Sequence, residues 1–469
     1  MKKNVVLAMI LFLALCSFFM LALGERLWSL GFFSLNFLVL IWECRKNSFF
    51  MFRLGFVYVI VVISVLNVFL GFDVSPNLKE AQTIQIADIA LIGGVLGLNS
   101  AWLGLALGEA VRFSGIQRRY VYTSLDFWLI AAMCFAVSYL IAQTRPLVFD
   151  LAYGADFERN AISSLGALNT LATALLLILV HIFTMLKVNS RVGNSFHLLV
   201  VLSIFSYLVI YAEFLRGMRM DAFTNIIAVT FYWYLLRRNK FPELKLKLLL
   251  VLLCLFLLSQ IWGVVRSSDL SLVVIDSNLL FSTFMMESER ASVLIYQGTF
   301  NDIASTYLGA IYLIENNIES LWFGESYFNY FLRTPPEFLW PDRPDTLSLL
   351  FKKHMLISGG GFFELGEGYL NFGMLGLIFH SFIISFYTGL SYKLAVSKRG
   401  SLLFSLPLIA ILSCFFRGYL YESFVFYKSF LIVSILFLFL YSFSYISRHV
   451  YTFKRTLIGG FSILIFGDL

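Results

Sequence analysis

The chain has 469 residues, of which 59% are hydrophobic and 13% are charged, and its formal net charge is +7 at pH 7. A water-soluble fold of this length cannot bury so much apolar sequence in one core, so a soluble protein is excluded. The apolar runs are continuous rather than alternating, which favours helices over barrel strands and predicts an all-α polytopic membrane protein.

Continuous apolar windows that are long enough to cross a bilayer predict about twelve helices. The N-terminal run has the basic and apolar regions of a signal peptide, but no small-residue cleavage site follows it, so we interpret it as an uncleaved first span. The predicted spans lie at approximately 4–24, 27–43, 52–72, 85–110, 124–143, 163–186, 194–214, 221–236, 246–265, 366–390, 401–416 and 422–446.

Lysines and arginines gather on every alternate connection between these spans. Because cytoplasmic connections are enriched in positive charge, the pattern predicts that both termini are cytoplasmic. The positive net charge therefore indicates topology and predicts no nucleic-acid partner. The basic clusters are Lys2 and Lys3; Arg45, Lys46 and Arg53; Arg112, Arg118 and Arg119; Lys187 and Arg191; Arg237, Arg238, Lys240, Lys245 and Lys247; Lys393, Lys398 and Arg399; Arg448, Lys454 and Arg455.

One connection, residues 266–365, is much longer than the others and falls on the external face. It includes "NLLFSTFMMESERASVLIY" and "DIASTYLGAIYLIENN", in which apolar residues recur at helical spacing. This pattern predicts a membrane-facing cap with interfacial helices. The chain then divides into nine spans over 1–265, the cap over 266–365, and three spans with a cytoplasmic tail over 366–469.

The stretch "FLRGMRMDAF" places Arg216 and Arg219 on the external face, where the topology rule predicts little positive charge. Guanidinium groups match phosphate oxygens in a bidentate manner and stay charged, so the pair is a candidate phosphate clamp. The alternative is structural, because Glu213 and Asp221 are near enough in sequence to form local ion pairs.

Further arginines lie on the same predicted face. Arg417, in "CFFRGYLYESF", is flanked by apolar stretches and is the best third candidate for binding an anion. Arg290, Arg333 and Arg343 lie in the cap, where each is a candidate sugar contact or, alternatively, a surface residue.

The stretch "SGGGFFELGEGYLNFGMLG", residues 358–376, runs into the predicted tenth span. Glu364, Glu367 and Asn371 have the i, i+3, i+7 spacing of one helix face at the external end of that span. A carboxylate there can act as a general base on a substrate hydroxyl. The alternative is that these carboxylates pair with external arginines and hold the cap to the helices.

The stretch "WFGESYFNYFLRTPPEFLWPDRPDT", residues 322–346, carries proline pairs that favour a rigid, non-helical loop. Trp322, Tyr327, Tyr330 and Trp340 offer flat faces on which sugars can stack. The alternative is that they anchor the loop at the membrane interface.

Motifs for metal and nucleotide chemistry are missing from the sequence: there is no Asp-x-Asp pair, no Walker loop and no His-Glu-x-x-His. We therefore predict no metal site and no cofactor. The energy for any reaction must then come from an activated substrate or from a gradient.

Three stretches together resemble the Wzy-type oligosaccharide repeat-unit polymerases, which include the O-antigen polymerases. They are "LRGMRMDAF" before a span, "PPEFLWPDRPDT" in a late external loop and "SGGGFFELGEGYLNFGMLG" entering the next span. The resemblance covers the whole topology, with its motifs in residues 215–376. Two positions depart from it: Gly368 stands where an alanine-like residue is common, and Arg343 where lysine is common.

The resemblance implies a metal-independent glycosyltransferase of GT-C-like, membrane-helical architecture at the external leaflet of the inner membrane. Its donor would be a glycan on undecaprenyl pyrophosphate, its acceptor a lipid-linked repeat unit, and a chain-length regulator a usual partner. Arg216 and Arg219, joined by Arg417, would grip the leaving diphosphate. Glu367, before "YLNFG", would activate the acceptor hydroxyl, with Glu364 or His354 as substitutes.

Two rival functions remain open from the sequence. An O-antigen ligase has a similar architecture and a histidine base, for which His354 is the candidate, but its acceptor is a lipid core. A polysaccharide flippase would carry charges in the middle of its helices and short external loops.

Overall fold

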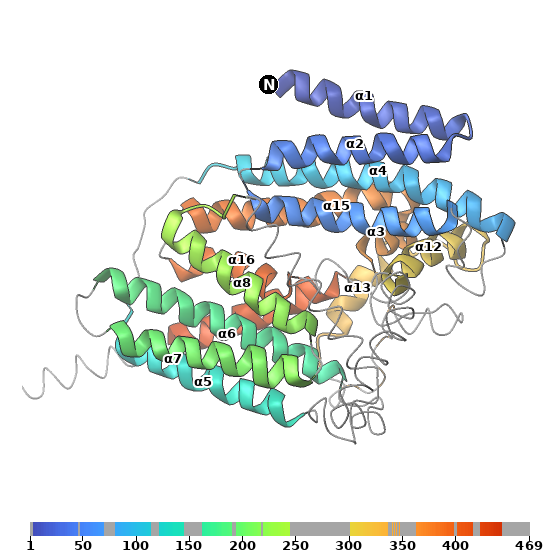
Figure 1. Ribbon diagram of the computed structural model, residues 1–469. Helices are drawn as coiled ribbons and strands as arrows, with labels where there is room; N and C mark the ends of the chain where they lie inside the picture. Colours follow the sequence, from blue (N-terminus) through green and yellow to red (C-terminus); the bar gives the residue numbers. More distant parts are fainter. Residues whose placement is uncertain are drawn as a thin grey trace, which may run out of the picture.

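The computed structural model describes residues 3–45, 47–69, 80–113, 122–144, 162–189, 194–216, 219–243, 301–335, 363–397, 401–415 and 423–442, together with residues 340, 342, 344 and 347. Over these residues the chain is helical and forms no strand (Figure 1). The elements are α1 Lys3–Ala22, α2 Arg26–Cys44, α3 Ser48–Phe69, α4 Glu80–Ala110, α5 Ser124–Gln143, α6 Ile162–Asn189, α7 Asn194–Ser206, the π-helix η2 Tyr207–Glu213, the 3-10 turn η3 Phe214–Arg216, α8 Arg219–Arg238, α12 Asn301–Glu315, α13 Glu325–Leu332, α15 Glu364–Ser397, α16 Leu402–Ser413 and a last helix Phe424–Ser442.

Nine helices in the described part of the chain are long and apolar enough to cross a membrane, which confirms a polytopic, all-helical membrane protein. Two further predicted spans coincide with shorter or more charged helices: α8 begins and ends with arginine, and α16 has only 12 residues. The predicted span 246–265 lies outside the described residues, so the total of twelve stays a prediction.

The helices form two groups. In Figure 1, α1 to α4 and α15 lie together, α5, α6 and α7 form the other group, and α8 and α16 lie between them. The closest packing joins α4 to α15, where a Cβ added at Gly104 or Gly108 would meet the backbone of Phe382 and Phe386. Such small residues let two helices approach closely in lipid, where burial of apolar surface gives no driving force.

The α15 element is two helices joined at a sharp turn. Phe372 and Gly373 depart from helical geometry, and Gly373 has φ +60° and ψ −141°, a conformation that only glycine adopts without strain. The turn brings Gly368 into direct backbone contact with Gly376. We call Glu364–Asn371 the short arm and 374–397 the long arm.

The direction of the short arm follows from its contacts. Arg53 of α3 bonds both Glu364, at the start of the short arm, and Ser385 of the long arm. In one continuous helix these two positions would be about 31 Å apart. The short arm therefore folds back against the long arm, so the prediction of one continuous helix over 366–390 is wrong.

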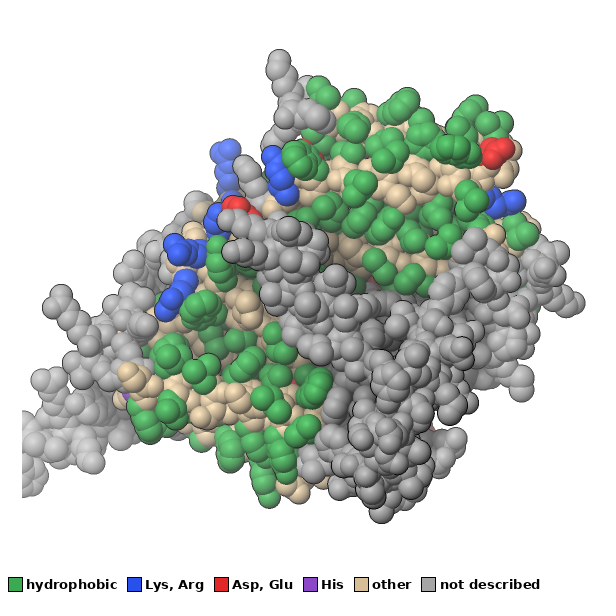
Figure 2. All heavy atoms as spheres, in the orientation of Figure 1, with side chains coloured by type: hydrophobic (Ala, Val, Ile, Leu, Met, Phe, Trp, Pro, Cys, Tyr) green, Lys and Arg blue, Asp and Glu red, His purple; other side chains and the backbone are tan. Residues whose placement is uncertain are grey.

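Arg53 does not belong to the basic connection to which the sequence analysis assigned it. It lies inside α3, and its side chain is completely buried. This burial is tolerated because the guanidinium pairs with the Glu364 carboxylate. Other described basic residues follow the expected pattern: Arg45 follows α2, and Arg237 and Arg238 end α8. Figure 2 shows the Lys and Arg side chains gathered mainly along the edge where these helices end.

The predicted interfacial helix "DIASTYLGAIYLIENN" corresponds to α12, but it does not lie on the surface of the bundle. Tyr307, Leu308 and Ile311 are completely buried, and the Tyr307 hydroxyl donates to the carbonyl oxygen of Ala90 in α4 (2.8 Å). The helix packs among α3, α4 and α15. Its apolar face is covered by protein. A helix that packs on protein along one face has the same spacing of apolar residues as a helix that lies on a membrane surface.

Candidate active site at the turn of α15

The short arm ends where the 322–324 segment crosses it. The last carbonyl groups of a helix have no partner within the helix. Here Trp322 N–H donates to the Leu370 carbonyl (3.0 Å), and Phe323 N–H donates to that of Asn371 (2.9 Å). Gly324, with φ +94°, then starts α13. The segment that begins α13 is thereby fixed to the turn of α15.

Glu367 lies on the short arm and is completely buried. Its Oε1 accepts a hydrogen bond from the Ser326 hydroxyl of α13 (2.9 Å), and its Oε2 accepts one from the backbone N–H of Ser423 at the start of the last helix (2.9 Å). Elements about 40 and 56 residues away in sequence thus hold one carboxylate. Its two oxygens are therefore held by two separate elements.

Asn371, one turn further along the short arm, completes this arrangement. Its amide nitrogen donates to Ser326 Oγ (2.8 Å) and to the carbonyl oxygen of Glu367 (2.8 Å), and its Oδ1 accepts from Gly324 N–H (3.1 Å). Asn371 therefore positions the serine that bonds Glu367. The i, i+4 relationship of the two residues brings them together as the spacing suggested.

His380 joins the same site from the long arm, and the sequence analysis did not select it. Its Nδ1 lies 2.5 Å from the Tyr327 hydroxyl and its Nε2 lies 2.6 Å from the Ser423 hydroxyl. The signal that could have found it is an ionisable side chain inside an apolar span, which by itself suggests a functional site.

Glu364 has different partners from Glu367. It is completely buried and pairs with Arg53, whose Nε donates to Ser385 Oγ (3.0 Å). The alternative in which a carboxylate of this stretch pairs with an arginine thus holds for Glu364, but the arginine comes from α3 and not from the predicted external set. Glu364 joins the short arm to α3 and to the long arm.

One aromatic residue of α13 bonds directly to the network. Tyr327 contributes its hydroxyl to His380, and burial, followed by the nearby carboxylates of Glu367 and Glu364, raises the pKa of this phenol. The phenol therefore stays protonated at neutral pH. Arg333, at the end of α13, is 7% exposed and lies over the ring of Phe424, 4.4 Å from its centroid.

An irregular stretch leads into the arginine pair of "FLRGMRMDAF". The π-helix η2 and the turn η3 lead to Arg216, and α8 begins at Arg219. π-Helical segments are uncommon and recur at functional sites. Glu213 accepts from Asn225 Nδ2 with both oxygens (2.8 Å each), and Asp221 accepts from Asn169 Nδ2 (2.8 Å).

Several predicted residues cannot be placed. The side chains of Arg216 and Arg219, and the whole of Arg290, Arg343, His354 and Arg417, lie outside the described residues. Trp340 is described, and its side chain is 36% exposed. Their roles stay predictions. Within the described part of the chain, no group of three His, Cys, Asp or Glu side chains is arranged to hold a metal ion.

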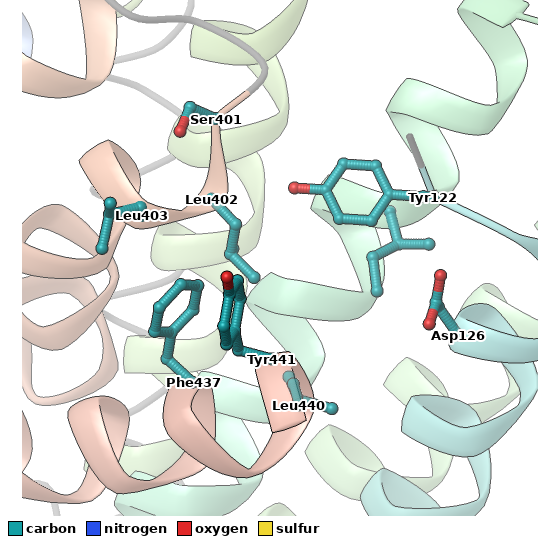
Figure 3. Close-up of a pocket in the computed structure, with 9 residues that line it drawn as sticks. Tyr122, Asp126, Ser401, Leu402, Leu403, Phe437, Leu440 and Tyr441 are labelled. Carbon is teal, nitrogen blue, oxygen red and sulfur yellow. The ribbon is translucent and has the colours of Figure 1, made fainter. Parts of the chain in front are cut away.

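A separate cavity of about 210 Å³ lies at the other end of the last helix (Figure 3). Its walls are mostly apolar, with Tyr122 and Asp126 on one side and Phe437 and Tyr441 on the other. Asp126 caps α5, since it accepts from the Thr123 N–H (2.8 Å). About 27 Å of helix separates Tyr441 from Ser423, so this cavity is not part of the Glu367 site.

The chain matches the family described as O-antigen polysaccharide polymerase Wzy over residues 4–449, which is nearly its whole length. The chain belongs to this family. No curated protein and no solved structure matches it. As a Wzy polymerase, it is an integral membrane protein of the glycosyltransferase type, and the turn of α15 with its buried carboxylate lies within the matched region.

Proposed function

We propose that this Wzy polymerase transfers a growing glycan from undecaprenyl pyrophosphate onto the next undecaprenyl-pyrophosphate-linked repeat unit. The reaction takes place at the periplasmic face of the bacterial inner membrane, with both termini in the cytoplasm. The observation that supports it best is Glu367, a buried carboxylate whose two oxygens are held by α13 and by the start of the last helix.

Glu367 acts as the general base in this proposal. A hydroxyl of the acceptor sugar attacks the anomeric carbon of the donor glycan, and its proton passes to the Glu367 carboxylate. The new glycosidic bond forms as the bond between the anomeric carbon and the phosphate oxygen breaks. The electron pair leaves with undecaprenyl pyrophosphate, so negative charge builds up on the diphosphate.

Arg216 and Arg219 stabilise that charge, with Arg417 as a third contact. Preoriented cationic donors lower the barrier where charge develops in the transition state. Guanidinium groups supply this charge without a metal ion, which agrees with the missing metal motifs of the sequence. The η2–η3–α8 stretch, an irregular backbone stabilised by the Glu213–Asn225 bond, carries both arginines.

The sugars of donor and acceptor contact the predicted cap, residues 266–365. Trp340, with its partly exposed ring, offers a stacking surface, and Arg290 and Arg343 supply hydrogen-bond donors. Asn371 belongs to the short arm, Tyr327 bonds His380 of the long arm and Arg333 lies over Phe424 of the last helix. We assign these three residues to holding Glu367 in place rather than to binding sugar alone.

The test is polymerisation of a synthetic lipid-pyrophosphate repeat unit by the purified protein in lipid, with EDTA and without nucleotide sugar. We expect a glycan ladder that disappears in Glu367→Gln and in Arg216→Ala. Arg26→Ala is the matched control, because Arg26 forms an ion pair with Asp88 (2.8 Å) away from this site and should leave the ladder intact.

Other products would overturn the proposal in specific ways. Transfer of a single glycan to a lipid A core without a ladder would identify a ligase, and His354→Ala should then abolish it. Movement of lipid-linked sugar across the bilayer with neither product would identify a transporter. A ladder that requires a divalent ion would contradict the metal-independent mechanism.

A further inference from the structure

His380 is an ionisable side chain within the apolar long arm of α15, and it is 6% exposed. Ionisable groups at such positions are costly to bury and persist where they pair or serve a site. Phe379 and Ile383 of the same arm are exposed on the surface of the bundle, whereas His380 lies on a protein-facing side of the helix.

Both ring nitrogens of His380 are engaged, and by residues from two different elements. Nδ1 lies 2.5 Å from Tyr327 Oη of α13, and Nε2 lies 2.6 Å from Ser423 Oγ. A neutral imidazole has one donor and one acceptor nitrogen, and a hydroxyl can match either. The ring is thus fixed at both ends.

Ser423 connects His380 to Glu367. Its hydroxyl bonds the histidine, while its own backbone N–H donates to Glu367 Oε2 (2.9 Å). The other oxygen of Glu367 is bonded by Ser326, which is the neighbour of Tyr327 in α13. The imidazole and the carboxylate are therefore clamped between the same two structural elements, and one residue separates them on the Ser423 side.

We propose that His380 is a positioning residue for the Glu367 carboxylate and does not itself touch the substrate. Its Nε2 bond holds the Ser423 hydroxyl, which fixes the direction of the Ser423 N–H toward Glu367. Its Nδ1 bond holds Tyr327, which reaches the carboxylate only through its neighbour Ser326, and the start of α13 is also fixed by the bonds at 322–323, so loss of the Nδ1 bond should disturb Glu367 less. The inference rests on the proposed function, in which Glu367 accepts the proton of the acceptor hydroxyl.

The two bonds can be separated by substitution. Glutamine carries its amide at about the reach of Nε2, and asparagine at about the reach of Nδ1. His380→Gln should therefore keep the bond to Ser423, and His380→Asn should keep the bond to Tyr327. In the ladder assay, we expect kcat to stay within about threefold of the wild type for His380→Gln and to fall about tenfold for His380→Asn, with KM unchanged in both.

A second variant makes the test independent of the fit of either amide. Ser423→Ala removes the hydroxyl and keeps the backbone N–H, so it should lower kcat as His380→Asn does. The double variant His380→Asn/Ser423→Ala should lose no more than either single one, since both act through one bond. All rates are divided by the amount of folded protein, which is determined by thermal unfolding in detergent.

Matched controls come from His181, a buried histidine of α6 whose Nδ1 lies 2.7 Å from Tyr232 Oη. His181→Gln and His181→Asn change the same chemistry away from Glu367, and their turnover per folded protein should equal that of the wild type. Equal turnover for His380→Gln and His380→Asn, a changed KM, or additive losses with Ser423→Ala would overturn the positioning role.

A failure of the proposed function would give a different result from a failure of the inference about His380. If Glu367→Gln forms the ladder at the wild-type rate, Glu367 is not the base and the positioning role falls with it. If Glu367→Gln is inactive while His380→Asn turns over at the wild-type rate, the base assignment stands and only the inference about His380 is wrong.

Discussion

Arg53 of α3 and Glu364 of α15 form an ion pair in which neither side chain has any exposed surface. Burial of one charge without its partner costs roughly 3–5 kcal/mol, whereas replacement of both members by neutral groups is often tolerated. We expect Arg53→Met and Glu364→Gln each to lower the free energy of unfolding by about this amount, and the double variant to recover most of it. Unfolding in detergent measures all three.

The same variants test whether Glu364 substitutes for Glu367 as the base. Under the structural role, turnover per folded molecule in the double variant Arg53→Met/Glu364→Gln should stay close to that of the wild type. A double variant that folds well but forms no glycan ladder would instead place Glu364 in the chemistry.

Gly368 and Gly376 test the turn of α15. A Cβ on Gly376 would meet the backbone carbonyl of Gly368, and backbone cannot move aside as a flexible side chain can. We expect Gly376→Ala to destabilise the protein by about 1–3 kcal/mol, the usual cost of overpacking. Gly31→Ala in α2 is the control, because nothing lies within 4 Å of its added Cβ. Equal unfolding midpoints for the two variants would contradict the contact.

Ser326 is the donor that α13 offers to Glu367. Ser326→Ala removes this bond and also the acceptor for Asn371, so the carboxylate should lose its orientation and kcat should fall about tenfold, the effect of one buried hydrogen bond. Ser391→Ala is the control, since its hydroxyl donates to the Tyr387 carbonyl of its own helix (2.7 Å), away from Glu367. Rates of ladder formation with a defined repeat unit give both values.

The pKa of Tyr327 is raised by burial and then by the carboxylates of Glu367 and Glu364. Folding therefore favours the neutral phenol, and this contribution to stability is complete below the ordinary tyrosine pKa of about 10 and is lost as the pH rises above it. The difference in unfolding free energy between the wild type and Tyr327→Phe should thus be constant from about pH 6 to 9 and shrink above about pH 10. A difference that changes near neutral pH would contradict this assignment.

The sequence predicted the spans well where a long apolar run has a clear start. The predicted span 124–143 coincides with α5, whose first turn is set by Thr123 and Asp126, which cap each other. The i, i+4 pair Glu367 and Asn371 was also predicted, because helical spacing alone brings those residues to one side.

The sequence could not predict what depends on the path of the backbone. A hydropathy window gives length but not direction, so "NFG" at Asn371–Gly373 looked like the beginning of a span and not like a reversal. The partners of Glu367 come from α13 and from the last helix, and no local pattern links them. The apolar span around His380 could have marked it as a candidate, but only the reversal brings it beside the short arm, so its partners could not be predicted.

The reversal in α15 also bears on the timing of the reaction. Ser326 and Tyr327 belong to a helix that is attached to the turn through the backbone N–H groups of residues 322–324, two of which donate to backbone carbonyls and one to the Asn371 side chain. Any displacement of that helix to admit a new repeat unit withdraws a donor from Glu367 at the same moment. Under the proposed function, Glu367 keeps both of its donors only while α13 stays in place against the turn of α15, so the alignment of the carboxylate depends on a contact between elements far apart in sequence.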